Sequence, residues 1–453
     1  WKGDLLPFIR KQVRKNNTKI VILDDDPTGT QTVHGLPVLT TWDIDSLKNE
    51  LKNSETAFFL LTNSRGYTKS EACCLGREIG LNLKQASENT GIKISFISRS
   101  DSTLRGHFPH EVDEVAKALG EDRLPYLICP FFLEGGRYTV NDIHYVAEKN
   151  LLIPAARTSY AEDATFGFKQ SNLCRWVEEK TEGRIAAEKV ISISLDDIRT
   201  GGPERVTQIL MEVPSKSACI VNAVSYKDIE VFVAGLLKSL SHGKQFLYRT
   251  AASFVRVAAG VVPKEKLLSK EELVSDNTTG GLFIVGSYVP KTTAQVTSLL
   301  KWTDILPVEI HVEKVLESSD RKKEISSART KITEAIKKGK DALIYTSRDL
   351  VKDDDPDVSL RIGQVVSSSL IEIIKDLECQ PRYIVAKGGI TSSDVATIGL
   401  GVKKAEVLGQ VLPGVPVWKL GKDSLFPGLS YIIFPGNVGQ NNDLATIQQK
   451  LSL

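Results

Sequence analysis

The sequence has little of several features that mark whole classes of protein. Its only methionine is Met211, its six cysteines include no CxxC pair, and its six histidines form neither HxH nor HExxH. Scattered cysteines of this kind are typical of reduced thiols, so we predict a cytoplasmic protein. The dispersed histidines and cysteines also argue against a zinc site.

Long apolar runs and a strong excess of one charge are absent too. No apolar run reaches the roughly 18 residues of a membrane span, and a net charge of +2 indicates neither a nucleic-acid nor a membrane partner. The absence of a Walker A sequence and of GxGxxG disfavours the common P-loop and dinucleotide folds. The 453 residues are enough for two large or three smaller domains. Because the chain opens on Trp1 rather than on methionine, we expect a piece of a longer polypeptide.

Short apolar runs rich in β-branched residues alternate with helical patterns along the chain. Strands are expected at residues 19–23, 57–61, 92–97, 127–129, 282–285, 308–311, 342–345, 383–386 and 431–434. This alternation is typical of α/β proteins with right-handed crossovers. We therefore predict two domains, each a largely parallel sheet flanked by helices, with the active site in the crevice between them. The expected boundaries are a substrate domain at 1–262, a linker at 263–280 and a nucleotide-binding domain at 281–453.

In the first half, three of the expected strands end in charged clusters. The acids Asp24, Asp25 and Asp26 follow the first strand, and Arg65 follows the second. The third strand leads to Asp101 and Arg105. Parallel sheets bind ligands beyond the carboxyl ends of their strands, so these loops are expected to converge.

This charged edge is suited to a polyol that carries a negative group. Arg65 and Arg105 are expected to fork onto a substrate carboxylate. Asp24, Asp25 and Asp101 are expected to hold hydroxyls, and either Asp101 or Asp25 to accept a proton as the catalytic base.

In the second half, the expected strands end in glycines instead. Gly286, the pair Gly388 and Gly389, and Gly436 each stand after a short apolar strand. Glycine lets backbone N–H groups approach a phosphate closely, and a following helix adds its partial positive charge. Thr391 or Ser392 would serve as helix N-cap or as phosphate ligand. A charged substrate site combined with a phosphate site describes a two-domain kinase.

Two other hypotheses stay open. Asp24-x-Asp26-x-Thr28 matches the DxDxT signature of haloacid-dehalogenase-like phosphatases, in which Asp24 would be the nucleophile and Asp26 the acid/base. That reaction leaves the glycine-rich half without a role. The third hypothesis is a non-catalytic sensor module that binds a sugar acid or a nucleotide.

Five motifs, in this order along the chain, resemble the four-carbon acid sugar kinase family. They are DDDPTG at 24–29, NSR at 63–65, DSTLRG at 101–106, SFVR at 253–256 and GGIT at 388–391. The resemblance implies an N-terminal acid-sugar domain, a C-terminal ATP domain, and phosphorylation of the terminal hydroxyl of threonate, erythronate or an oxo-tetronate.

The resemblance also implies where ATP would be contacted. The residues are Ser287, Gly388, Gly389, Ile390, Thr391 and Gly436. Mg²⁺ is expected together with ATP, although no ligands for the metal can be named. Some members of the family are fused to dehydrogenase or aldolase modules, so we expect such a fusion here. We also expect a homodimer.

Overall fold

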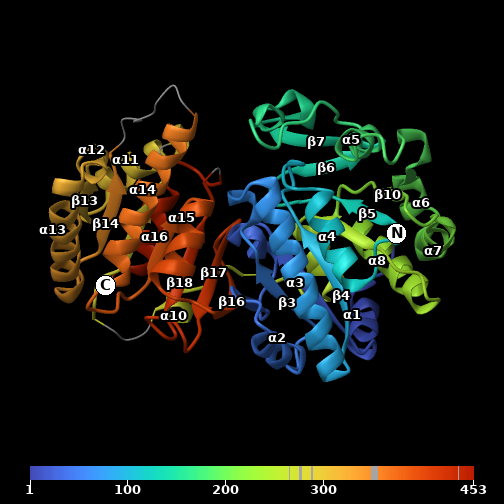
Figure 1. The fold of residues 1–453 in the computed structure, drawn as a ribbon, viewed down its shortest axis with the longest axis horizontal. Coiled ribbons are helices and arrows are strands. Elements are labelled where there is room, and N and C mark those ends of the chain that lie inside the picture. The colour runs from blue at the N-terminus through green and yellow to red at the C-terminus, as the bar shows by residue number, and fades with distance from the viewer. Residues whose placement is uncertain (265, 275–277, 287–288, 348–355, 437, 453) are drawn as a thin grey trace. The chain divides into compact units, whose positions relative to one another are not determined.

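The computed structural model describes residues 1–264, 266–274, 278–286, 289–347, 356–436 and 438–452. The chain divides into two compact units, Trp1–Pro263 and Lys264–Leu453. Each unit contains a largely parallel sheet with helices packed on it (Figure 1). The predicted α/β fold class with two domains is therefore confirmed.

The main sheet of the first unit is entirely parallel, with the strand order β2-β3-β1-β4-β11-β5-β10-β9. Its strands are β1 (Thr18–Asp24), β2 (Pro37–Leu39), β3 (Ala57–Leu61), β4 (Lys93–Arg99), β5 (Tyr126–Cys129), β9 (Ile191–Ile193), β10 (Ala218–Val221) and β11 (Leu247–Thr250). The helices are α1 (Leu6–Lys15), α2 (Ile44–Leu51), α3 (Lys69–Thr90), α4 (His110–Leu119), α5 (Leu173–Lys180), α6 (Leu195–Arg199), α7 (Gly202–Glu212), α8 (Tyr226–Ser241) and α9 (Ala252–Ala258). This order places β1 between β3 and β4.

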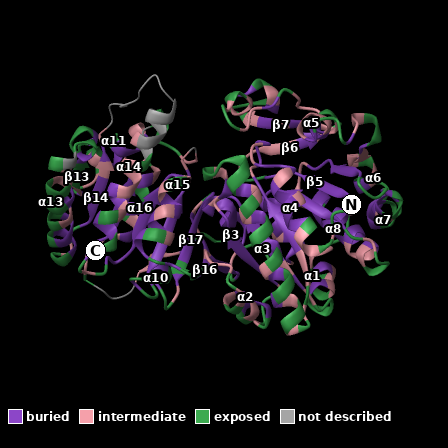
Figure 2. Cartoon of the chain, in the orientation of Figure 1, coloured by how far each residue is buried: buried purple, intermediate pink, exposed green. Residues whose placement is uncertain are grey.

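Burial of both faces explains why the strands read as continuous apolar runs. All five residues of β3 are buried, and Figure 2 shows the strands buried while the helices keep an exposed face. On one face, alternate residues such as Val21 and Phe58 pack against Ile79 and Leu83 of α3. Helix α3 begins with a capping box in which the side chains of Thr68 and Glu71 satisfy each other's backbone N–H groups.

A small antiparallel sheet accompanies the main sheet of this unit. It consists of β6 (Arg137–Val140), β7 (Ile143–Glu148) and β8 (Leu151–Pro154), in that order. A bridge between Thr139 and Ala223 ties it to the segment after β10. The strands expected from the sequence do not include these three, since they are short and show no clear periodicity.

The sheet of the second unit has the order β13-β14-β12-β15-β18-β17-β16, and the first five strands are parallel. The strands are β12 (Leu282–Val285), β13 (Leu306–Ile310), β14 (Ala342–Thr346), β15 (Ile384–Lys387), β16 (Lys404–Leu412), β17 (Val415–Leu420) and β18 (Ser430–Phe434). The helices are α10 (Lys270–Leu273), α11 (Pro290–Trp302), α12 (Val312–Leu316), α13 (Ser318–Lys337), α14 (Pro356–Lys375), α15 (Gly389–Asp394) and α16 (Asp443–Leu451). Strand β15 lies between β12 and β18, so three glycine-bearing strand ends are neighbours.

Two segments of this unit differ from the sequence analysis. Strands β16 and β17 form an antiparallel hairpin that the sequence analysis did not predict. Two signals for it exist in the sequence, because buried and more exposed residues alternate along β16 and Pro413 and Gly414 form the turn that follows. The expected linker contains helix α10, and its Leu268 and Leu273 are buried in the core of the second unit. These residues therefore belong to the folded unit rather than to an open connection.

The described helices were also compared with the requirements of a membrane span. Among them, none combines the length with the apolar composition that crossing a bilayer requires.

Candidate active site

The carboxyl ends of β1, β3 and β4 carry the charged residues that the sequence analysis singled out. Asp24 is the last residue of β1, Arg65 lies in the turn after β3, and Asp101 follows β4. Because these strands are neighbours in a parallel sheet, their ends meet at one edge. The structure brings all five predicted substrate residues, together with Asp26, into one network of ion pairs.

Arg65 stands at the centre of this network. Its Nε lies 3.3 Å from Oδ1 of Asp25, its Nη2 lies 2.6 Å from Oδ2 of Asp26, and its Nη1 lies 3.9 Å from Oδ1 of Asp101. The side chains of Arg65, Asp26 and Asp101 keep 18, 19 and 12% of their surface exposed. One guanidinium therefore joins acids from two different strand ends while it remains open to solvent.

Arg105 forms the outer border of the network. Its Nε donates to Oδ2 of Asp101 over 2.7 Å, and its Nη1 lies 3.4 Å from Oδ2 of Asp163. The hydroxyl of Thr103 donates to the same oxygen of Asp101. The guanidinium also lies 5.1 Å above the ring of Tyr160, a cation–π distance.

A deeper layer lies beneath these partly exposed groups. Arg99 donates from Nη1 to Oδ1 of Asp24 over 2.9 Å and lies 3.4 Å from Oδ1 of Asp25. Ser100 donates its hydroxyl to Oδ2 of Asp25 over 2.8 Å. Asp24 and Asp25 are only 1 and 3% exposed, so this layer supports the outer one from below.

Two glycines make room for the buried carboxylates. A Cβ atom on Gly29 would come within 2.1 Å of a carboxylate oxygen of Asp24. A Cβ on Gly106 would come within 2.7 Å of the Ser100 hydroxyl and 3.3 Å of Asp25. The glycines of the DDDPTG and DSTLRG motifs are thus required by the packing of the acids themselves.

Burial and pairing separate the acids electrostatically. Burial raises the pKa of Asp24 to about 7, against the opposing charge of Arg99 and with help from Asp25 and Asp26. Burial acts in the same direction on Asp101, but the charges of Arg105 and Arg65 outweigh it and hold its pKa well below the usual range. The pKa of Asp26 is likewise lowered, because the charge of Arg65 and hydrogen bonds from Thr28 exceed the effect of burial.

The strand ends of the second unit carry little charge. Lys387, the last residue of β15, is fully buried and donates from Nζ to the carbonyl oxygens of Pro435 over 2.6 Å and Gly436 over 3.2 Å. Its ammonium lies 4.3 Å from the centre of the Phe434 ring. Burial and the charge of Lys291 lower the pKa of Lys387 to about 7. The lysine thus holds the turn after β18 in place from below.

The backbone at this edge leaves open space beside its glycines. Gly388 has a φ of +108°, which favours glycine. Among the described residues, the nearest atom to a Cβ added at Gly436 would be Cα of Gly388, at 4.0 Å. Within the described residues, the turns after β15 and β18 therefore leave room for a further group beside Gly436.

The residues predicted to contact the nucleotide lie partly in helix α15 and partly outside the described residues. Gly389, Ile390 and Thr391 form the first turn of α15, and Ile390 is 63% exposed. The first N–H groups of a helix have no partner within the helix. Thr391 lies against Gly286, where a Cβ would come within 2.6 Å of its Oγ1. Ser287 lies outside the described residues.

The expectation that Thr391 or Ser392 is the N-cap of this helix is wrong. Gly388 occupies the cap position, and no side chain caps it. The hydroxyl of Ser392 instead donates 2.9 Å back to the carbonyl of Ala386 in β15. Its side chain therefore points into the unit and is not available to a phosphate.

The described residues offer no ready site for Mg²⁺. Among them, no group of three or more histidine, cysteine, aspartate or glutamate side chains is arranged to hold a metal ion. Asp394 ends α15, but its Oδ2 accepts a hydrogen bond of 2.7 Å from Ser367. We therefore derive no step of the reaction from a metal held by protein side chains.

The sequence analysis missed several residues of the charged site. It assigned no role to Arg99, which pairs with Asp24, or to Asp163, which pairs with Arg105. Arg249 and His144, both fully buried, bind the backbone of the loop that carries Asp101. A signal existed for Arg249, since it follows a short apolar strand as Arg99 does, whereas nothing local marks His144.

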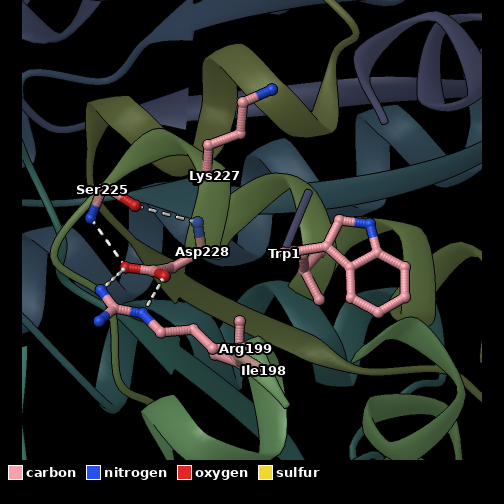
Figure 3. Close-up of a pocket in the computed structure, with 7 residues that line it drawn as sticks. Trp1, Ile198, Arg199, Ser225, Lys227 and Asp228 are labelled. Atoms are coloured by element: carbon pink, nitrogen blue, oxygen red, sulfur yellow. Dashed lines mark hydrogen bonds and ion pairs between the residues drawn. The ribbon is translucent and has the colours of Figure 1, made fainter. Parts of the chain in front are cut away.

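A small cavity of about 130 Å³ lies away from these strand ends, between α6 and α8 (Figure 3). Its polar groups are already satisfied. Asp228 accepts 2.8 and 3.0 Å hydrogen bonds from the fork of Arg199 and further ones from the N–H groups of Val224 and Ser225. The cavity is therefore best explained as a packing gap beside a structural ion pair.

Comparisons with known proteins agree with this division of the chain. Residues 20–258 match the family model of a sugar-binding N-terminal domain, and residues 282–444 match that of a nucleotide-binding C-terminal domain. The first match alone covers more than half of the chain. No curated protein matches the sequence.

Two solved structures share the fold. A protein from Haemophilus influenzae is 18% identical, with a TM-score of 0.64, and the match covers 95% of this chain and all of the other. A protein from Salmonella typhimurium LT2 with the provisional name tRNA synthase is 15% identical, with a TM-score of 0.67 and coverage of 95 and 98%. At such identities the likeness establishes the fold alone, so the provisional name carries no weight for function here.

The two domain matches together identify a chain that joins a sugar-binding unit to a nucleotide-binding unit, and they follow the order of the sequence motifs. The chain therefore belongs to the four-carbon acid sugar kinase family.

Proposed function

We propose that the protein is an ATP-dependent kinase that phosphorylates the terminal hydroxyl of a four-carbon acid sugar, namely threonate, erythronate or an oxo-tetronate. The observation that carries this proposal is the partly exposed network of Arg65, Arg105, Asp26 and Asp101 in the sugar-binding domain. A domain that binds nucleotides accompanies it in the same chain.

The arginines have N–H groups that a substrate carboxylate would engage. Two contacts of these arginines are long, namely Nη1 of Arg65 to Asp101, at 3.9 Å, and Nη1 of Arg105 to Asp163, at 3.4 Å. Their replacement by charge-assisted hydrogen bonds to a carboxylate would leave the shorter pairs intact. The proposal thus assigns Arg65 and Arg105 to the acid group of the substrate.

The carboxylates are assigned to the hydroxyl groups. Asp101 remains ionised over the whole physiological range, since its pKa lies well below the usual value, so it is ready to accept a hydrogen bond from the attacking hydroxyl. Asp25, the other base expected from the sequence, is 3% exposed and held by Ser100 and Arg65, so the proposal assigns the base to Asp101. Phosphoryl transfer depends mostly on positioning and on electrostatic stabilisation, so a base of low pKa is sufficient. When bound, ATP supplies the phosphoryl group that is transferred.

The phosphatase hypothesis gains no support from the geometry. A nucleophilic aspartate must be ionised and reachable, but Asp24 is 1% exposed, its pKa is raised to about 7, and Arg99 occupies its Oδ1. Gly29 closes the other side of the carboxylate. A sensor without catalysis would use the same binding groups and differs from the kinase only in turnover.

A coupled ADP-release assay tests the proposal. The purified chain is incubated with ATP, Mg²⁺ and, one at a time, D- and L-threonate, D- and L-erythronate and their oxo forms. We expect ADP release with at least one acid and none without acid. ATP binding without release on any acid would instead support the sensor, and release of phosphate from phosphorylated acids without ATP would support the phosphatase.

A further inference from the structure

The loop from 100 to 109, between β4 and α4, has a strained backbone at the position where it carries the charged site. Leu104 has a φ of +71° and is only 1% exposed, and Gly106 has a φ of +115°. A non-glycine residue in the left-handed region persists only where its surroundings fix it. The loop bends here so that Asp101 and Arg105 can form their 2.7 Å ion pair.

A buried arginine holds both ends of this bend. Arg249, in strand β11, is fully buried, and its Nη2 donates to the carbonyl oxygens of Asp101 over 2.8 Å and Arg105 over 3.0 Å. Among the described residues, no carboxylate forms an ion pair with it. Burying an arginine without a carboxylate partner is costly, so its two bonds to the loop call for a functional explanation.

An aromatic stack fixes the arginine and the loop together. The guanidinium of Arg249 lies 5.3 Å from the centre of the Trp176 ring. Phe108, a few residues after Arg105 in the same loop, stacks on Trp176 with 5.1 Å between centroids and 16° between planes. Trp176 is fully buried, so it serves as a rigid surface that both Arg249 and the loop contact.

A buried histidine binds the middle of the bend. His144, in β7 of the small sheet, lies with Nε2 2.7 Å from the carbonyl oxygen of Ser102 and with Nδ1 3.0 Å from the hydroxyl of Thr139. The carbonyl can only accept, so Nε2 carries the proton and Nδ1 accepts from Thr139. Burial lowers the pKa of His144 to about 3, which keeps the ring neutral.

We propose that Arg249 and His144 are positioning residues that clamp the 101–106 loop, so that Asp101 and Arg105 are preorganised for the acid substrate. This inference rests on the proposed function and deepens it. Three carbonyl groups of one strained loop are held by two fully buried side chains from different elements. A loop released from this clamp would relax at Leu104 and separate the base candidate from the carboxylate-binding arginine.

The variant Arg249→Lys tests the clamp, since lysine keeps the charge but loses the planar fork and the stack on Trp176. We expect kcat/KM for the acid to fall about 30-fold, mostly through KM, while KM for ATP changes by less than about twofold. His144→Gln keeps a donor for the Ser102 carbonyl and should lose much less than His144→Leu.

Arg382→Lys is the matched control, because Arg382 is also a buried arginine that binds a backbone carbonyl, that of Leu451 in the second unit. We expect it to lower the unfolding temperature without changing KM for the acid. If Arg249→Lys behaves like Arg382→Lys, or if His144→Leu leaves KM for the acid unchanged, the clamp has no positioning role.

Hydrogen exchange separates failure of the clamp from failure of the proposed function. Amides 101–106 should exchange faster in Arg249→Lys than in the unaltered protein, and at the unaltered rate in Arg382→Lys. This result supports the clamp even if no acid is phosphorylated. Unchanged exchange in Arg249→Lys overturns the clamp whatever the activity.

Discussion

The two domains share one architecture but differ in what stands at the ends of their parallel strands. In the sugar-binding domain, β1, β3 and β4 lead into aspartates and arginines that pair with one another. In the nucleotide-binding domain, β12, β15 and β18 lead into glycines. The sheet supplies the common edge, and the loops after the strands supply the chemistry.

Buried charged side chains have different partners at the strand ends of the two domains. At the first edge, Asp24 and Asp25 are compensated by Arg99 and Ser100 underneath, so that Arg65 and Arg105 can remain partly exposed. At the second edge, the buried cation Lys387 is compensated by backbone carbonyls rather than by a carboxylate. We therefore expect side chains to hold the ligand groups in the first domain and backbone groups to hold them in the second.

The largest expected effect comes from removing the charge of Asp101. Asp101→Asn should lower kcat by about 10³-fold, because the attacking hydroxyl loses its candidate base and Arg65 and Arg105 lose a shared partner. ATP affinity, measured by calorimetry, should stay within about twofold. If ATP affinity fell as much as kcat, the assignment of acid binding to the first domain and ATP binding to the second would be wrong.

The next effect concerns the space reserved for Asp24. Gly29→Ala would place a Cβ within 2.1 Å of the carboxylate, so we expect a loss of about 3 kcal/mol in the free energy of unfolding. Gly66→Ala is the control, since its Cβ would meet only the amide nitrogen of Asn63, at 3.8 Å. Urea unfolding of both variants would show whether packing on the acids, rather than loss of a glycine, is responsible.

A smaller effect is expected from the glycine edge. Gly388→Ala adds a side chain at a φ of +108° beside the gap to Gly436, and ATP affinity should fall about tenfold. Gly401→Ala also adds a side chain at a positive φ, +62°, but with no described atom within 4 Å, so it should leave ATP affinity unchanged. Equal losses of ATP affinity in the two variants would mean that general backbone strain, rather than a side chain at the turn after β15, weakens nucleotide binding.

A further expected effect is a dependence of stability on pH. The pKa of Asp24 rises on folding from 3.8 to about 7, so between these values the folded chain binds a proton that the unfolded chain has released. Stability therefore falls as pH rises from about 4 to 7, with a slope of at most about 1.4 kcal/mol per pH unit.

Asp24→Asn should remove this contribution to the pH dependence of the free energy of unfolding, measured by thermal unfolding from pH 4.5 to 7. Glu111→Gln is the comparison, since burial also raises the pKa of Glu111 to about 7, and it should remove a similar part. A slope that is unchanged in Asp24→Asn would show that the buried acid stays ionised.

The fold was largely predictable from the sequence, because strands buried on both faces leave continuous apolar runs, as residues 57–61 do. The hairpin of β16 and β17 and the small sheet of β6 to β8 were missed. Their strands are short or only partly apolar, so they lack the continuous apolar runs that mark strands buried on both faces.

The sequence predicted those residues of the charged site that directly follow a strand. The convergence of Asp24, Arg65 and Asp101 follows from parallel neighbours, so position along the chain was enough. The support of the site was not predictable in this way. His144 reaches Ser102 from a different sheet, and the pairing of Arg105 with Asp163 spans 58 positions.

The most direct test of the account is ³¹P nuclear magnetic resonance of the unaltered protein with ATP, Mg²⁺ and the acid that gives the most ADP. The account predicts that the γ-phosphate signal disappears while a phosphomonoester of the acid and ADP appear in equal amounts. Accumulation of inorganic phosphate without an ester would contradict it, because the phosphoryl group would then pass to water rather than to a substrate held by the charged edge.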